Sequence, residues 1–186
     1  TSDTVMRIDE LPPTMIILGG GYIATELGHV FSALGVDVTL INRGEKLLKN
    51  EDEDVSNRFT ESQSKRLNLK CGSTVHRVWN DNDGFHVAFE RLGAQEQANA
   101  ELVLVAAGRV PNGDSLNVEA AGVTHQSNRV VVDKYFRTDV EGIWAFGDLS
   151  NKHQLKHLAN AEVKALRHNL LVAEGLEEPL RSVDDR

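Results

Sequence analysis

The feature that most constrains this chain is a glycine-rich segment that separates a short apolar run from a helical pattern. The apolar run, residues 15–18, is short and continuous, which is typical of a strand buried in a parallel sheet. After the glycines, apolar residues recur at helical spacing from residue 23 to 34, and Gly35 marks where that helix should end. Residues 36–40 then alternate as a second strand. This order predicts a βαβ unit with a right-handed crossover, and therefore an α/β fold built on a Rossmann-like parallel sheet.

The glycine-rich segment matches the pattern G-x-G-x-x-A, whose positions each help to hold a dinucleotide. Gly19 permits a tight turn, Gly21 lets the backbone approach a pyrophosphate, and Ala24 allows the helix to pack closely on the strand. The helix that begins here offers unpaired N–H groups and a partial positive charge to the phosphates. The candidate dinucleotide-binding residues in this turn are Gly19, Gly21, Tyr22, Ile23 and Ala24. A glycine turn without a ligand is the weaker interpretation, because the βαβ context is complete.

The end of the second strand indicates which dinucleotide is bound. A site for NAD places Asp or Glu there to accept from the ribose 2′-hydroxyl, whereas a site for NADP requires a cation for the 2′-phosphate. Here Asn42 and Arg43 follow the strand, and Lys46 and Lys49 come shortly after. A guanidinium binds phosphate through paired hydrogen bonds, and a lysine binds it as a point charge. We therefore expect NADPH at Asn42, Arg43 and Lys49, although Glu45 counts against this and a solvated basic loop is the alternative.

The middle of the chain changes to two-residue alternation, which predicts an antiparallel β-meander inserted between strands of the parallel sheet. Residues 67–71 alternate, and residues 75–79 and 85–89 flank a turn that ends in Asp83-Gly84, which is typical of a hairpin. The acidic run at 51–54 fits the first turn of a helix better than a metal site. Further elements are expected as strands at 102–106, 130–132 and 143–146 and as helices at 116–121 and 155–171.

Composition excludes several classes of function. The 20 Lys and Arg against 28 Asp and Glu give a formal net charge of −8, which does not favour nucleic acid as a partner. No apolar stretch approaches the roughly 20 residues that cross a bilayer, so no membrane partner is expected. A single cysteine, Cys71, excludes an internal disulfide and suits a reducing cytoplasm. His153 and His157 lie four residues apart without an evident third ligand, so no metal site is expected.

Two later motifs extend the pattern from a fold to a family. Residues 106–112 read Ala-Ala-Gly-Arg-Val-Pro-Asn after the returning strand, and residues 142–148 read Gly-Ile-Trp-Ala-Phe-Gly-Asp. Together with the glycine turn, and in the same order, they resemble the two-dinucleotide flavoprotein disulfide reductases, a family that includes glutathione reductase and dihydrolipoamide dehydrogenase. Ala107 stands where that family usually has threonine.

The resemblance implies roles for individual residues. Tyr22 would cover the nicotinamide pocket before hydride transfer, and Glu26 would lie near the nicotinamide and the flavin. Asp148 would bind the ribityl chain of FAD, and the backbone at Leu158 and Ala159 would lie beside the isoalloxazine ring. The cofactors implied for the parent enzyme are NADPH and FAD. The other motif residues implied at cofactor sites are Ala107, Gly108, Arg109 and Gly147.

The resemblance also implies that the chain is a central piece of a longer, homodimeric enzyme. The family uses a Cys-x4-Cys pair and a His-Glu couple that this chain does not contain. Residues 1–11 are expected to be a crossing segment from the FAD domain, residues 12–114 to bind NAD(P)H, and residues 115–186 to be a partial FAD-binding or central segment. We therefore expect no catalytic residue in the chain, no retained FAD, and no disulfide reduction by the chain alone.

Three segments resemble one branch of the family, whose members use NADPH to reduce the disulfide of a small thiol. They are residues 1–12, Arg43-Gly44 with Leu47-Leu48, and residues 155–162. The expected substrate of the parent enzyme is therefore a small-molecule disulfide. A dihydrolipoamide dehydrogenase or a soluble transhydrogenase on the same scaffold is one alternative, although the first usually prefers NAD. A module that senses NAD(P) without chemistry is another, but it would have no need of Asp148.

Overall fold

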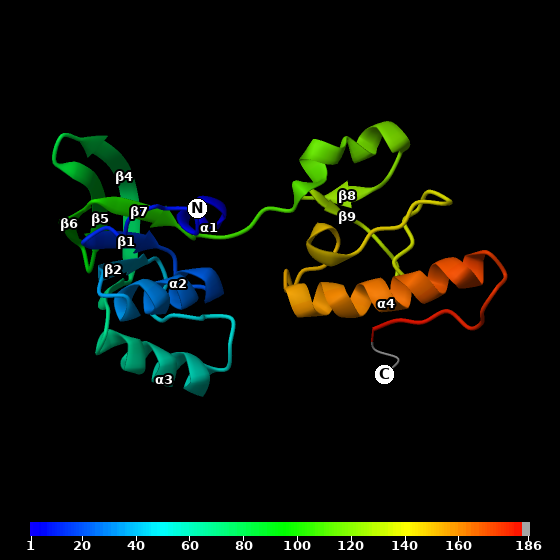
Figure 1. The fold of residues 1–186 in the computed structure, drawn as a ribbon, viewed down its shortest axis with the longest axis horizontal. Helices are drawn as coiled ribbons and strands as arrows, with labels where there is room; N and C mark the ends of the chain where they lie inside the picture. Colours follow the sequence, from blue (N-terminus) through cyan, green and yellow to red (C-terminus); the bar gives the residue numbers. More distant parts are fainter. Residues whose placement is uncertain (184–186) are drawn as a thin grey trace. The chain divides into compact units, whose positions relative to one another are not determined.

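A parallel sheet carries the predicted βαβ unit in a computed structural model that describes residues 1–183 (Figure 1). The order of its four strands is β3 (Asn68–Cys71), β2 (Asp37–Asn42), β1 (Thr14–Leu18) and β7 (Leu102–Val105). Every neighbouring pair is parallel. The helix α2 (Tyr22–Ala33) connects β1 to β2, and α3 (Glu53–Ser64) connects β2 to β3. The α/β class and the Rossmann-like sheet are confirmed.

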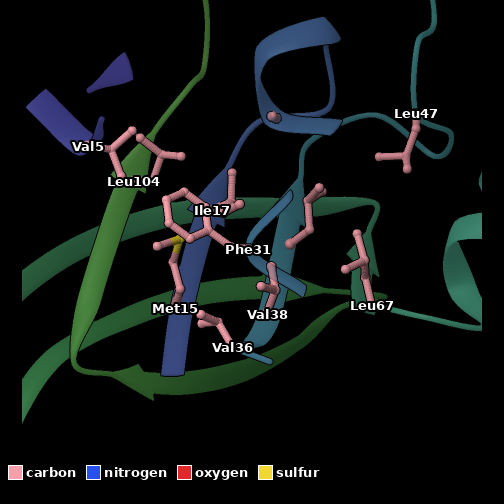
Figure 2. Close-up of a cluster of buried hydrophobic side chains, with 11 residues drawn as sticks. Val5, Met15, Ile17, Phe31, Val36, Val38, Leu47, Leu67 and Leu104 are labelled. Carbon is pink, nitrogen blue, oxygen red and sulfur yellow. The ribbon is translucent and has the colours of Figure 1, made fainter. Parts of the chain in front are cut away.

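Both faces of this sheet are buried, because successive side chains of a strand point to opposite faces. On one face Ile17 of β1 packs with Val38 of β2 and Phe31 of α2 (Figure 2). On the other face Ile16 packs with Phe89, which belongs to a second sheet. The strand that precedes the glycine turn is therefore fixed from both sides.

The second sheet is the predicted antiparallel meander, made of β4 (Ser73–Asp81), β5 (Gly84–Arg91) and β6 (Ala94–Ala100). The hairpin at Asp83-Gly84 is confirmed, since Asp81 pairs with Gly84. Residues 67–71 do not join the meander as their alternation had suggested, because β3 pairs in parallel with β2. The strand β6 was not predicted.

The second half of the chain is organised around α4 (Lys156–Ala173), close to the predicted helix at 155–171. Three other expectations were wrong. Residues 116–121 form 3₁₀ turns, η1 (Asn112–Leu116) and η2 (Val118–Ala121), and the strand expected at 130–132 ends at Val130 in β9 (Arg129–Val130), which pairs only with β8 (His125–Gln126). Residues 143–146 are not a strand, because within the described part of the chain their ladder is a single bridge between Arg137 and Trp144.

The chain divides into two compact units, Thr1–Gly108 and a second that begins at Arg109. Residues 109–114, which the sequence grouped with the nucleotide-binding part, lie in the second unit. A short helix, α1 (Ser2–Val5), occupies the predicted crossing segment. Residues 184–186 of the predicted C-terminal segment lie outside the described residues. Across residues 1–183, none of the helices combines the length and the apolar character that crossing a membrane requires.

Candidate functional site

A cleft of about 560 Å³ lies in the first unit, where β1, β2 and β7 end. Its walls come from the glycine turn, the loop after β2, the start of β4 and residues 105–108. The carboxyl ends of parallel strands meet at this edge, and β1 lies between β2 and β7, so the cleft is at the point where the strand order reverses. The structure brings together eight of the predicted site residues here, namely Gly19, Gly21, Tyr22, Asn42, Arg43, Lys49, Ala107 and Gly108.

The three glycines of the turn differ in their surroundings, and the structure itself requires two of them. Gly19 has a φ of +136°, and a Cβ there would lie 2.3 Å from the carbonyl oxygen of Ala106. A Cβ on Gly20 would lie 2.4 Å from Cγ of Asn42, so this middle glycine, which sequence reasoning missed, is needed for close packing. A Cβ on Gly21 would meet nothing within 4 Å. The open space above Gly21 therefore fits the predicted approach of a pyrophosphate to the backbone.

The loop after β2 is held against the glycine turn by hydrogen bonds. Asn42 Nδ2 donates to the carbonyl oxygens of Gly44 and Lys46, both at 2.9 Å. The backbone N–H of Leu48 donates to the carbonyl oxygen of Gly20 at 2.7 Å. The Asn42 Nδ2 group is thus engaged within the loop, which it shapes, while Asn42 also lines the cleft and its contact with the cofactor stays a prediction.

Two cations of this loop are available to a ligand. Lys46 Nζ lies 3.1 Å from Oε1 of Glu53, so its charge is partly neutralised. Arg43 and Lys49 are exposed in the cleft wall, and neither has an ion-pair partner among residues 1–183. A guanidinium and an ammonium in this position match the charge and hydrogen-bonding needs of a phosphate monoester.

The N-terminus of α2 opens at the cleft without a side-chain cap. The Thr25 hydroxyl is a donor, to the carbonyl oxygens of Gly21 and Tyr22, and does not accept from the first N–H groups of the helix. These N–H groups therefore have no side-chain cap and can bind an anion. Ala24 is buried and Ile23 is half-buried, so they support the turn and do not line the cleft. Glu26 is exposed one turn beyond Tyr22, also outside the cleft lining.

The second unit brings together the residues that the family resemblance assigned to FAD. Arg109 Nη2 lies 3.0 Å from Oδ2 of Asp148, at the 3₁₀ turn η3 (Gly147–Leu149). The N–H of Gly147 donates to Oε2 of Glu162 at 2.7 Å, and Ala159 lies beside this turn, since a Cβ on Gly147 would be 3.5 Å from its Cβ. Leu158, adjacent on α4, is half-buried. The carboxylate of Asp148 remains 38% exposed, which leaves it accessible to hydroxyl donors such as those of a ribityl chain.

Sequence reasoning missed three functional or supporting side chains. Glu51 accepts a hydrogen bond from the Tyr22 hydroxyl, and this bond raises the pKa of Tyr22. Glu162 is a carboxylate only 4% exposed on α4, whose buried residues also include His168 and Asn169, so no apolar pattern singles it out in the sequence. Asn169 is fully buried and binds the backbone of Arg181 at 2.8 and 2.7 Å. Nothing in the spacing of Tyr22 and Glu51 predicts their contact.

Other reactive groups do not form a site. Within residues 1–183 no group of three or more His, Cys, Asp or Glu side chains could hold a metal ion. Cys71 is partly buried at the end of β3, and burial raises the pKa of its thiol, which makes it a weak nucleophile.

The class is defined by the glycine turn at the switch point of a parallel sheet, the uncapped helix N-terminus and two cations that have no ion pair among residues 1–183: this is an α/β domain of the dinucleotide-binding type. Comparison with protein-family models narrows the class, because residues 1–165 match the pyridine nucleotide-disulphide oxidoreductase model. The chain belongs to this family.

Individual relatives agree with that assignment. Mycothione reductase of Mycobacterium tuberculosis is 48% identical over 171 residues, which cover 92% of this chain and 37% of the relative. Mercuric reductase of Staphylococcus aureus is 36% identical, covering 92% of this chain and 32% of the relative. The structure of the HOCl-induced flavoprotein disulfide reductase RclA from Escherichia coli matches with a TM-score of 0.82 at 30% identity, covering 98% of this chain and 40% of RclA. The chain thus spans well under half the length of each relative.

Proposed function

We propose that this chain is the NADPH-binding portion of an FAD-dependent disulfide reductase whose substrate is mycothione, the disulfide of mycothiol. The observation that supports NADPH is the presence of two exposed cations, Arg43 and Lys49, in the wall of the cleft at the end of β2, neither of them in an ion pair within residues 1–183. The 48% identity to mycothione reductase supports the substrate. So do residues 1–12 and 155–162, which resemble that enzyme.

In this proposal the cleft orients NADPH through backbone N–H groups and through the loop that follows β2, residues 43–51, which we call the basic loop. The uncapped N–H groups of α2 and the open backbone at Gly21 bind the pyrophosphate. Arg43 and Lys49 bind the 2′-phosphate, which NADH lacks. Ala107 and Gly108 form the opposite wall, where neither residue adds a bulky side chain. Tyr22, which follows Gly21 directly, covers the nicotinamide end.

The second unit contributes the carboxylate of Asp148, which accepts from the ribityl hydroxyls while Arg109 fixes its orientation. When bound, FAD supplies the two-electron relay between the nicotinamide and the disulfide. The redox cysteine pair lies outside this chain, so the chain alone should not reduce a disulfide.

Calorimetric titration tests the cofactor. NADPH should bind more tightly than NADH, and Arg43→Ala should weaken NADPH binding about tenfold while leaving NADH binding nearly unchanged, because only NADPH carries the 2′-phosphate. Lys65→Ala is the matched control, since this lysine is the C-cap residue of α3, is paired with Glu61 and does not line the cleft. Binding of NADH as tight as NADPH would overturn the proposal in favour of the dihydrolipoamide dehydrogenases.

Turnover by the full-length enzyme tests the substrate. NADPH oxidation should be stimulated by mycothione far more than by lipoamide or mercuric ion. Stimulation by lipoamide or mercuric ion alone would assign the chain to another branch of the family. A full-length protein that binds NADPH but no FAD would instead be a nucleotide sensor.

A further inference from the structure

Asn42 is the last residue of β2, and the side chain at this end of the strand distinguishes NAD from NADP in dinucleotide-binding sheets. Its Nδ2 group donates to the carbonyl oxygens of Gly44 and Lys46, both at 2.9 Å. A side-chain amide nitrogen carries two hydrogens, so these two bonds use both of them. The donor end of Asn42 is therefore directed at the basic loop.

The two bonds fold residues 43–46 back over the end of β2. The carbonyl oxygen of Gly44 also accepts from the N–H of Gly72 at 2.9 Å, whereas within residues 1–183 the carbonyl oxygen of Lys46 accepts from Asn42 alone. Arg43 begins this turn and its side chain is exposed, so packing does not direct its guanidinium. The backbone that directs it is held by Asn42.

Lys49 is positioned by separate contacts. Leu47 is fully buried, and its N–H donates to a threonine hydroxyl of α3 at 3.0 Å. The N–H of Leu48 donates to the carbonyl oxygen of Gly20 at 2.7 Å. The spacing between the two cations of the cleft wall is therefore set by Asn42 at one end and by these anchors at the other.

The place of Asn42 does not suit the carboxylate that an NAD site uses. A Cβ on Gly20 would lie 2.4 Å from Cγ and 2.5 Å from Oδ1 of Asn42, so the amide is packed on the glycine turn without room for a longer acid. An aspartate has the same shape, but it would direct an acceptor at the carbonyl oxygens of Gly44 and Lys46. Acceptors repel one another, so the turn would open.

We propose that Asn42 is a positioning residue that selects NADPH by holding the turn that directs Arg43, so that an acid at this position removes the preference for NADPH without creating one for NADH. The inference rests on the proposed function, because it takes the cleft as the NADPH site. It requires that Asn42 and Arg43 act on the 2′-phosphate as one unit.

Calorimetric titration in a double-mutant cycle tests this unit. Asn42→Leu, which keeps the approximate shape of the side chain without its donors, should weaken NADPH binding about tenfold and leave NADH binding nearly unchanged. In the Arg43→Ala background it should have little further effect, because both changes act through the same guanidinium. Asn68→Leu is the matched control, since Asn68 is exposed at the opposite end of β3 and does not line the cleft. An undiminished loss in the Arg43→Ala background, or an equal loss for NADH, would overturn the inference.

Hydrogen exchange followed by NMR tests the turn without a ligand. In Asn42→Leu the N–H of Gly72, which is bonded to the carbonyl oxygen of Gly44, should exchange faster than in the parent chain. The N–H of Leu48 should keep its protection, because its bond to Gly20 lies beyond the turn. Equal protection of Gly72 in the two chains would show that Asn42 does not hold the turn, and would overturn the inference.

Asn42→Asp tests the claim about the acid. It should weaken NADPH binding and should not tighten NADH binding. Its NADPH dissociation constant, divided by that of the parent at the same pH, should decrease as the pH falls toward about 5, because a protonated carboxyl regains a donor. A gain in NADH affinity, or a ratio independent of pH, would overturn the inference.

The same titrations separate this inference from the proposed function. A parent chain that prefers NADPH by the same factor as Asn42→Leu would overturn the role of Asn42 alone. A parent chain that binds NADH as tightly as NADPH would overturn the proposed function, and the role of Asn42 with it.

Discussion

Replacing Glu162 should lower the free energy of unfolding of the second unit and leave that of the first unit unchanged. Glu162 is 4% exposed, and its two carboxylate oxygens accept from two different donors, the N–H of Gly147 and Nδ2 of Asn151. This contact fixes the turn that carries Asp148 against α4. Glu162→Ala leaves both donors without their acceptor, the N–H of Gly147 in a buried place and Nδ2 of Asn151 in a part-buried one.

The cost follows from the number of bonds that each substitution removes. A buried hydrogen bond to a charged group contributes roughly 1.5–3 kcal/mol, so Glu162→Ala should cost about 3–5 kcal/mol. Glu162→Gln keeps the shape but has a single acceptor oxygen facing two donors. It should therefore lose one of the two bonds and cost about half as much. An exposed acid at the end of the same helix, Glu174, is the control, and Glu174→Gln should change stability by less than about 0.5 kcal/mol.

The chain provides its own probe for this measurement. Trp144 packs beside Phe136, Ala165 and Leu166 in the second unit, and the other tryptophan, Trp79, is in the first. In a Trp79→Phe background, Trp144 fluorescence during urea denaturation reports the second unit alone. The reasoning is refuted if Glu162→Ala and Glu162→Gln unfold at the same urea concentration as the parent.

Three further predictions concern the first unit. The hydrogen bond with Asp81 raises the pKa of His86, and the same bond lowers the pKa of Asp81. The pair should therefore stabilise the unit most between pH 3.8 and 6.5, the ordinary pKa values of the two groups, and should lose its effect as the pH rises through the raised pKa of His86 or falls through the lowered pKa of Asp81. In His86→Gln the urea midpoint should depend less on pH. A dependence equal to that of the parent chain would contradict this. Phe89→Ala, which empties a fully buried position between the two sheets, should cost about 3–5 kcal/mol by denaturation, and a loss below 1 kcal/mol would argue against that packing. Gly20→Ala should displace the Asn42 amide and weaken NADPH binding in calorimetry, so an unchanged affinity would show that the close approach is not required.

The parts of the fold that could be predicted are those whose periodicity is set by burial. The sheet around β1 is covered on both faces, so β1 and β7 are continuous apolar runs, β2 shows buried alternation, and the helix α2 shows a regular apolar stripe. The strand β6 escaped prediction because its sequence, Ala-Gln-Glu-Gln-Ala-Asn-Ala, is polar and has low strand propensity. It is a strand because its whole length pairs with β5. The prediction for residues 143–146 was wrong in the opposite direction. Their sequence is apolar like that of a strand, but within the described residues they form a single bridge and no strand pairs along them.

Some residues of the candidate site could likewise be predicted from the sequence, and others could not. Gly19, Gly21 and Arg43 could be predicted because a local motif carries their chemistry, and they line the cleft. Gly20 and Glu51 could not, because their requirement comes from contacts across the fold, with Asn42 and Tyr22 respectively. A local motif can be recognised in the sequence, whereas side chains that shape the cleft through contacts between distant segments depend on tertiary packing.

The attachment of the basic loop has a consequence for engineering. The loop is fastened by main-chain bonds, from Leu48 to Gly20 and from Gly72 to Gly44, and by the inward-facing amide of Asn42. None of these fastenings uses the side chains of Arg43 or Lys49. The charge of these two side chains should therefore be reversible by substitution, while the path of the loop and the sheet beneath it stay as they are.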